Sequence, residues 1–334
     1  MSGHTYFLLL DQHVEKDELH KITIENDFKE YKNQRQENSY LWKGEKYETT
    51  RGCYFSFGHN AFIEGADKKY KTVCAASVIG GASYADVKKQ FSIIESIKNV
   101  YGGEIFDPIN NSWGFRENEI PPKLSKTEIA CGIVYVRFKV RVSRKAADYL
   151  IEEVNPNHIW FDFSIDMYDY PDSLVNNNKI MNELITTFEV FLKNFFKKYL
   201  ETNKSAYEKF VIDCKSEKQL NDNEKFETHM KKYSFQNLKD LNKVYKKYID
   251  FNLKQEVLNI EMVPGKEDTK IGYILGELLK NRHSKSHDDI HNTELTKAKV
   301  IEYRTVMETF GREFIGKFME RKNLKLLIEY ELGY

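Results

Sequence analysis

Residues 178–200 read NKIMNELITTFEVFLKNFFKKYL, and this stretch decides the architecture of the second half of the chain. Its apolar residues recur at spacings of three and four, two to each helical turn. That period is typical of a long amphipathic α-helix with one broad buried face. We therefore predict that residues 175–334 form a helical bundle around this helix.

The rest of this half shows the same periodicity. It predicts three further helices, over 237–260, from Asp268 or Thr269 onward, and over 293–321. Residues 202–232 are polar and charged, and we predict a loop with broken helix there. Four or five helices with short connections are typical of a bundle.

The first half carries strand signals instead. Runs rich in Val, Ile, Tyr and Phe predict strands over 5–10, 53–57, 71–78, 104–106, 129–142 and 158–165. Helix patterns begin at Ser83 and Ser143. The order over 70–166 is β-α-β-β-α-β, which is that of a ferredoxin-like unit. We therefore predict an α+β protein, with a ferredoxin-like domain for sensing or recognition over 1–170. Residues 1–69 either add strands to its sheet or form a separate lobe.

Composition excludes several classes of protein. The 334 residues carry 51 basic and 51 acidic side chains, and this balance excludes a uniformly basic nucleic-acid coat but not a local basic patch. Apolar residues make up 41% of the chain, too many for a disordered protein, and their runs are too short to span a bilayer. The four cysteines lack C-x-x-C spacing, which indicates reduced thiols. We expect a cytoplasmic protein without a metal or other cofactor.

Residues 277–291, ELLKNRHSKSHDDIH, follow the third predicted helix and hold the most informative pattern. Arg282 lies four residues after Leu278, so it extends the apolar stripe of that helix. One interpretation is a helix C-terminus, where basic residues interact favourably with the negative end of the helix dipole. The other interpretation depends on the histidines that follow.

Arg282-His283-Ser284-Lys285-Ser286-His287 resembles the signature of the HEPN superfamily, the higher-eukaryote and prokaryote nucleotide-binding domains. That signature is Arg, four to six residues, then His, with Asn, Asp or His favoured after the Arg, inside a helical bundle. The resemblance covers residues 175–325. Glu277 matches an upstream Glu of the family, whereas Asn281 interrupts the basic pair before the motif. Asp289 stands where members controlled by nucleotidylation carry Tyr.

The resemblance implies a metal-independent RNA endonuclease that acts as a homodimer, with Arg282 and His287 as the active pair and His283 as the polar residue of the motif. Histidine suits the proton transfers of RNA cleavage, and arginine suits the phosphate charge. On a continuous helix the two side chains would point ~140° apart, so they converge only if the helix ends between them or two chains each contribute a pair. HEPN nucleases serve as toxins, as antiviral defence effectors against phage, or in CRISPR-linked systems. An attached N-terminal domain then recognises an antitoxin, a trigger protein, a small nucleotide or the RNA.

Two alternatives remain open for the same histidines. His283, His287 and His291 are spaced i, i+4 and i+8, so on a continuous helix they would line one face and form the ligands of a metal-dependent hydrolase. Alternatively, the three histidines are ordinary surface residues. A different class of protein also remains open, a HEPN module that binds nucleotide or scaffolds an assembly without catalysis.

Two features of the first half are candidate binding sites. In the predicted strand over 133–142, Arg137, Lys139 and Arg141 alternate with four valines and a phenylalanine, so one face would present a row of cations to RNA or another ligand. The alternative is a solvated outer face of the sheet. Gly80 and Gly81 precede the helix that begins at Ser83, and such a turn is able to seat a phosphate.

Overall fold

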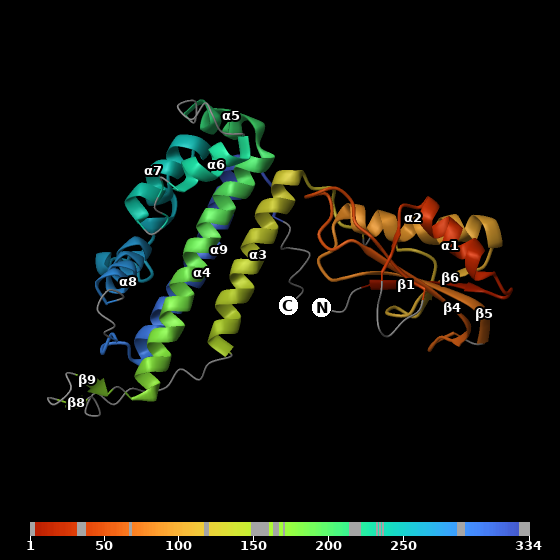
Figure 1. The fold of residues 1–334 in the computed structure, drawn as a ribbon, viewed down its shortest axis with the longest axis horizontal. Coiled ribbons are helices and arrows are strands. Elements are labelled where there is room, and N and C mark those ends of the chain that lie inside the picture. Colours follow the sequence, from red (N-terminus) through yellow and green to blue (C-terminus); the bar gives the residue numbers. More distant parts are fainter. Residues whose placement is uncertain are drawn as a thin grey trace. The chain divides into compact units, whose positions relative to one another are not determined.

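The computed structural model describes residues 4–31, 38–66, 69–116, 120–147, 160–162, 167–169, 171–213, 222–231, 233, 235, 237–285 and 291–326. The chain forms two compact units that meet in sequence between Ile129 and Ala130 (Figure 1). A sheet with helices makes up the first unit, and the second is predominantly helical. The α+β class, with an N-terminal sheet and C-terminal helices, is therefore confirmed.

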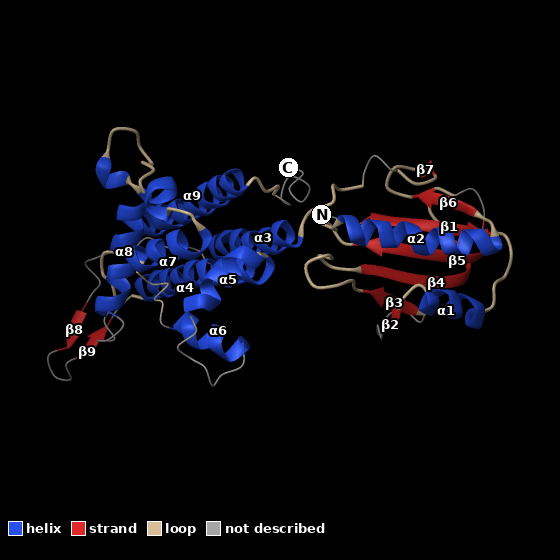
Figure 2. Ribbon diagram, turned by 90° about the horizontal axis from the view of Figure 1, so that it is seen from above, coloured by secondary structure: helices blue, strands red, loops and turns tan. Residues whose placement is uncertain are grey.

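The first unit is built on a seven-stranded antiparallel sheet of order β2-β3-β4-β5-β1-β6-β7. The strands are β1 (His4–Leu10), β2 (Lys29–Glu30), β3 (Ser39–Trp42), β4 (Cys53–Phe62), β5 (Lys69–Val78), β6 (Glu104–Asp107) and β7 (Ser112–Trp113). Helices α1 (Lys16–Glu25) and α2 (Tyr84–Tyr101) both pack on one face of this sheet (Figure 2). Tyr6, Leu8 and Leu10 of β1 point into the core under the helices.

The elements β1-α1-β4-β5-α2-β6 have the β-α-β-β-α-β order of a ferredoxin-like unit. β1 lies between β5 and β6 and is antiparallel to both, so α2 connects two parallel strands across β1. In the same way, α1 connects β1 to β4 with β5 between them. The predicted ferredoxin-like arrangement is present, but it occupies residues 4–107 instead of 70–166. Residues 1–69 supply β1 to β4 of the same sheet.

The strand predicted over 129–142, and with it the helix start at Ser143, is wrong. Residues Lys126–Ala147 form a single helix, α3, which belongs to the second unit from Ala130 onward. The buried side chains of its described part follow helical spacing: Cys131, Val134, Tyr135, Phe138 and Val142. Five apolar residues alternate with polar ones over 134–142. Only two of them, Val136 and Val140, lie outside this buried face.

A buried carboxylate ties the start of α2 to the loop before β4. Ser83 caps α2, and Asp86 completes a capping box by accepting a hydrogen bond from the Ser83 backbone N–H. The same carboxylate accepts bonds from the backbone N–H groups of Thr50 and Gly52 and from the Thr50 hydroxyl. Asp86 thus places a negative charge of the protein itself at this helix N-terminus, where a phosphate after Gly81 was one interpretation.

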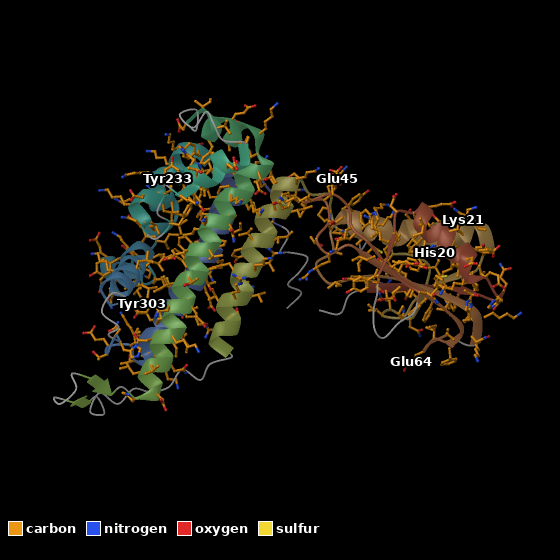
Figure 3. All side chains as sticks on the ribbon, viewed as in Figure 1. His20, Lys21, Glu45, Glu64, Tyr233 and Tyr303 are labelled. Carbon is orange, nitrogen blue, oxygen red and sulfur yellow. The ribbon has the colours of Figure 1, made fainter. Side chains whose placement is uncertain are left out.

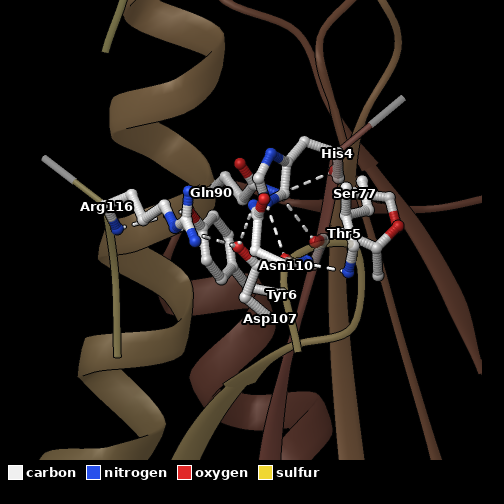
Figure 4. Close-up of polar contacts among 10 residues, drawn as sticks. His4, Thr5, Tyr6, Ser77, Gln90, Asp107, Asn110 and Arg116 are labelled. Carbon is white, nitrogen blue, oxygen red and sulfur yellow. Dashed lines mark hydrogen bonds and ion pairs between the residues drawn. The ribbon is translucent and has the colours of Figure 1, made fainter. Parts of the chain in front are cut away.

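A second polar cluster joins β1 to the end of β6 (Figure 4). Asp107 is fully buried and accepts hydrogen bonds from the Asn110 side chain and from the backbone N–H of Ile109. His4 Nε2 lies 3.3 Å from one carboxylate oxygen and Arg116 Nε lies 3.8 Å from the other. The hydrogen bonds and the charge of His4 outweigh the effect of burial and hold the pKa of Asp107 below its usual value.

The second unit contains α3 and six further helices in its described part. They are α4 (Asp172–Thr202), α5 (Lys204–Asp213), α6 (Asp222–Lys231), α7 (Leu238–Ile249), α8 (Ile271–Lys285) and α9 (Lys297–Lys322). Short turns, η4 (Lys254–Leu258) and η5 (Glu267–Thr269), precede α8, and a small hairpin of β8 (Trp160–Asp162) and β9 (Met167–Asp169) precedes α4. None of the described helices is long and apolar enough to cross a membrane.

The predicted long helix over 178–200 is confirmed as α4, and its phenylalanines form the centre of the bundle core. Phe195 makes edge-to-face contacts with Phe314 and Phe318 of α9 at centroid distances of 4.7 and 4.9 Å. Two expectations are wrong in detail. Much of 202–232 is helical, as α5 and α6, and the predicted helix over 237–260 breaks at Asp250, whose φ is +48°.

Candidate functional site

The Arg-to-His motif lies at the C-terminal end of α8. Buried residues Ile271, Ile274, Leu275, Leu278 and Leu279 hold this helix in the core, and it ends at Lys285. Arg282 and His283 belong to its last turn, although their side chains lie outside the described part of the structure, as does all of His287. The described part of α8 therefore contains Arg282 and His283, and the expected convergence of Arg282 and His287 lies outside the described residues.

Two asparagines of α4 fasten the chain just after the motif. The Asn178 amide donates to the backbone oxygen of Asn292 at 3.1 Å, and the backbone N–H of Asn292 donates to Asn178 Oδ1 at 2.8 Å. The buried Asn177 amide donates to the Leu295 oxygen at 2.9 Å. These bonds hold residues 291–295 against the first turns of α4. The attachment therefore begins at residue 291, four residues after His287 in the sequence.

A groove of about 580 Å³ opens beside this attachment. Its lining comes from α3, from α4 and from the chain after α8: Arg141, Val175, Asn178, Lys179, Asn182, Glu183, Thr186, Thr187 and His291. We call this the α3–α4 groove. It brings together Arg141 and His291, two predicted site residues that are far apart in the sequence. Amide, hydroxyl and cationic groups in one groove suit a phosphate backbone with ribose hydroxyls.

The three predicted cations of residues 137–141 do not form one row. Because α3 is a helix, Arg137 and Arg141 are one turn apart on the same face and Lys139 is about 200° away from Arg137. Arg137 and Arg141 are exposed, whereas Lys139 is half-buried. Only Arg141 of the three lines the α3–α4 groove. The predicted cationic strand face is therefore wrong, because the three side chains do not share one face of α3.

Glu277, the upstream acidic residue of the motif, acts electrostatically on α9. Its charge raises the pKa values of Lys299 and Tyr303. For Tyr303 (Figure 3) burial is the largest cause of the raised pKa. For Lys299 burial lowers the pKa, and it is outweighed mainly by Glu302, 3.0 Å away, with Glu277 the smallest contribution. Lys299 Nζ also lies 4.9 Å from the centre of the Tyr303 ring. This cluster joins α8 to α9 directly below the motif.

The sequence did not point to a hydrogen-bonded chain that connects α5, α6 and α7. The Tyr233 hydroxyl (Figure 3) lies 3.1 Å from His229 Nε2 and 2.7 Å from the Tyr248 hydroxyl, which donates to Asp213 at 2.7 Å. Lys247 Nζ lies 2.6 Å from the same carboxylate. The bonds from Lys247 and Tyr248 lower the pKa of Asp213. Such a chain suits a structural role, because it fixes three short helices to one another.

The metal alternative falls mostly outside the described residues. His291 is described, but the side chains of His283 and His287 are not. Within the part of the chain that the structure describes, no cluster of three or more His, Cys, Asp or Glu side chains is arranged to hold a metal ion.

Comparison of the chain with family models, with curated proteins and with solved structures gave no significant match.

Proposed function

We propose that this chain is a metal-independent endoribonuclease of the HEPN type, a hydrolase that binds RNA in the α3–α4 groove and cleaves it with Arg282 and His287. The observation that carries the proposal is the position of the motif. Arg282 lies in the last described turn of α8, and from residue 291 the chain is fastened beside an open groove that contains Arg141 and Lys179.

The chemistry follows from the residue types. The ribose 2′-OH attacks the adjacent phosphorus, and the P–O bond to the 5′-oxygen breaks. His287 takes part in the proton transfers, because the pKa of an imidazole lies near neutrality. Arg282 stabilises the charge that builds on the phosphorane, and His283 lies beside it in the motif. The products are a 2′,3′-cyclic phosphate and a 5′-hydroxyl.

We further propose that the active species is a homodimer, in which two Arg282/His287 pairs form one composite cleft. The argument from surplus apolar surface does not support this proposal, because the Phe-rich faces of α4 and α9 are buried within one chain. The argument that remains is chemical, since one chain supplies a single pair. Light scattering at micromolar concentration tests it, and an active monomer would refute it.

We propose that the protein serves in the cell as a toxin or as an antiviral defence effector. A toxin or antiviral defence nuclease needs an inhibitor or a trigger, and the N-terminal unit is the part of this chain available to recognise one. A cytoplasmic location is consistent with the free, buried thiols of Cys53, Cys74 and Cys131. Burial raises the pKa of the Cys74 thiol to about 12, so this group is an unreactive thiol at neutral pH.

The test of the proposed function is incubation of the purified full-length protein with RNA in EDTA, followed by mapping of the product ends. Cleavage with 5′-hydroxyl ends, and none of a substrate with a 2′-deoxy sugar at the cut, supports the proposal. Activity that vanishes in EDTA and returns with zinc, manganese or nickel would instead support the metal hydrolase of His283, His287 and His291.

A further inference from the structure

The first unit contains a larger cavity, of about 660 Å³, on the helix-bearing side of the sheet. Its walls come from the end of β3 and the loop after it, from the first turns of α2, and from the loop that precedes α3. We call it the α2 cavity. Its volume lies in the range typical of sites for small molecules. All its lining residues precede Ala130, so the first unit forms this cavity by itself.

One wall of the α2 cavity is aromatic and apolar. Trp42, Tyr47 and Tyr84 line it, and Pro121 and Pro122 contribute the facing loop. The Trp42 ring is positioned from two sides. A Cβ at Gly44 would approach it to 2.9 Å, and Lys89 Nζ lies 5.3 Å from its centre. Aromatic rings that are held in place form a surface on which a planar heterocycle can stack without ordering a flexible side chain.

Most of the charged side chains that line the cavity are positive. Four lysines line it, at positions 88, 89, 123 and 126, against one carboxylate, that of Glu48. Lys126 lies 3.1 Å from Glu48 and 2.8 Å from Glu45 (Figure 3), so its charge is already neutralised. Lys89 lies 3.5 Å from Asp27. Among the residues that the structure describes, Lys88 and Lys123 have no ion pair.

Lys88 and Tyr84 are one turn apart on α2, and Lys88 Nζ lies 6.0 Å from the centre of the Tyr84 ring. A cation beside an aromatic ring in one cavity matches a ligand that carries an anion next to a planar group. The α2 N-terminus does not supply the anion site, since Asp86 already accepts the Ser83 N–H there. The anion is held by lysine ammonium groups instead.

From this juxtaposition we propose that the α2 cavity is a binding site for a small nucleotide. Its base stacks against the aromatic wall of Trp42 and Tyr84, and its phosphates contact Lys88 and Lys123. The site is independent of the Arg282/His287 motif, because it lies in the other unit. The proposal therefore stands or falls separately from the proposed nuclease.

Isothermal titration of the full-length protein tests the site, with ATP and AMP as probes, adenosine as the base without phosphate, and pyrophosphate as the phosphate without base. We expect ATP to bind and both fragments to bind at least about tenfold more weakly, because each satisfies one wall only. Lys88→Ala with Lys123→Ala should weaken ATP binding by about tenfold or more. Tyr84→Ala should weaken ATP binding while pyrophosphate binding stays unchanged.

Two matched variants give the outcomes that overturn the proposal. Lys21→Ala with Lys98→Ala removes the same charge from exposed positions on α1 and α2. An equal loss of ATP affinity in this control would show that the lysines act through general charge attraction and not through a binding site. Arg282→Ala should leave ATP binding unchanged. Loss of ATP binding in that variant would place the nucleotide at the motif instead of the α2 cavity. Absence of ATP binding at about 1 mM would also refute the proposal.

Discussion

The ring of Phe138 on α3 lies directly against the backbone of Gly311 on α9. A Cβ at position 311 would approach Phe138 Cε1 to 2.5 Å, closer than two carbons can pack. On its other side, Phe138 stacks on Phe191 of α4 at a centroid distance of 4.2 Å. The phenyl ring is thus held between α4 and α9, and this contact fixes α3 to the helical unit.

Gly311→Ala should therefore destabilise the helical unit by about 1–3 kcal/mol, although alanine favours a helix over glycine by about 1 kcal/mol. Gly316→Ala is the matched control on the same helix, because no atom lies within 4 Å of the position that its new methyl group would take. That variant should be stabilised by about 0.5–1 kcal/mol. Urea unfolding measures both, and equal effects would contradict the packing of α3 on α9.

His287→Ala and Arg282→Ala should each abolish RNA cleavage in EDTA while urea unfolding stays unchanged. Arg282→Lys should not restore activity, because lysine cannot make the bidentate phosphate contact of a guanidinium. His291→Ala separates the two mechanisms, since the proposed nuclease does not use this imidazole in its proton transfers and a metal site would need it. Cleavage by the His287→Ala protein at the native rate would show that the assignment is wrong.

Arg141→Ala should weaken RNA binding and reduce the dependence of log Kd on log salt concentration by about one unit, as expected for the loss of one phosphate contact. Its control is Lys193→Ala, which removes an exposed cation from α4 outside the α3–α4 groove. Filter binding of the cleavage-inactive protein at several salt concentrations measures this effect. An unchanged salt dependence for Arg141→Ala would exclude the groove as the RNA site.

Asn178→Ala should destabilise the helical unit by about 1–3 kcal/mol, because it leaves the buried ends of two hydrogen bonds to Asn292 without partners. It should also reduce cleavage, since residues 291–295 lose part of their attachment beside the motif. Asn182→Ala, one turn further along α4, removes an amide for which the structure gives no side-chain hydrogen bond and should leave stability unchanged. Urea unfolding compares the two variants, and cleavage in EDTA is measured for Asn178→Ala alone, because Asn182 also lines the α3–α4 groove. Equal stability of the two variants would contradict the proposed role of the attachment.

Asp107 predicts how the stability of the first unit depends on pH. Its pKa in the folded protein is lowered, so the unfolded state binds the proton more readily. The stability that the carboxylate contributes is complete above its ordinary pKa of about 4 and is lost as the pH falls through the lowered value. Asp107→Asn should cost about 1.5–3 kcal/mol at neutral pH and flatten this acid dependence. Asp27→Asn, at an exposed position, is the control, and urea unfolding at about pH 5, 4 and 3 checks both.

Periodicity predicted α4, α8 and α9 because their apolar residues recur every three to four positions over several turns. It also predicted α2, where Ser83 and Asp86 form a cap through local bonds. It failed at α3, because the same valines satisfy a period of two and a helical face at once. Propensity could not decide between them, since β-branched residues disfavour a helix by less than about 1 kcal/mol each. The packing of Phe138 against Gly311 accompanies the helical form, and that contact joins residues far apart in sequence.

The sequence by itself determined the α+β class, the long helices and the helix that carries Arg282, because all of these depend on short-range spacing. Only the tertiary structure placed the ferredoxin-like unit at residues 4–107, since strand order depends on pairing between distant segments. It likewise brought Arg141, Lys179 and His291 to one groove, and Trp42, Lys88 and Lys123 to one cavity. Neither group of residues can be recognised from a local sequence pattern, because each is brought together by the packing of segments that lie far apart in the sequence.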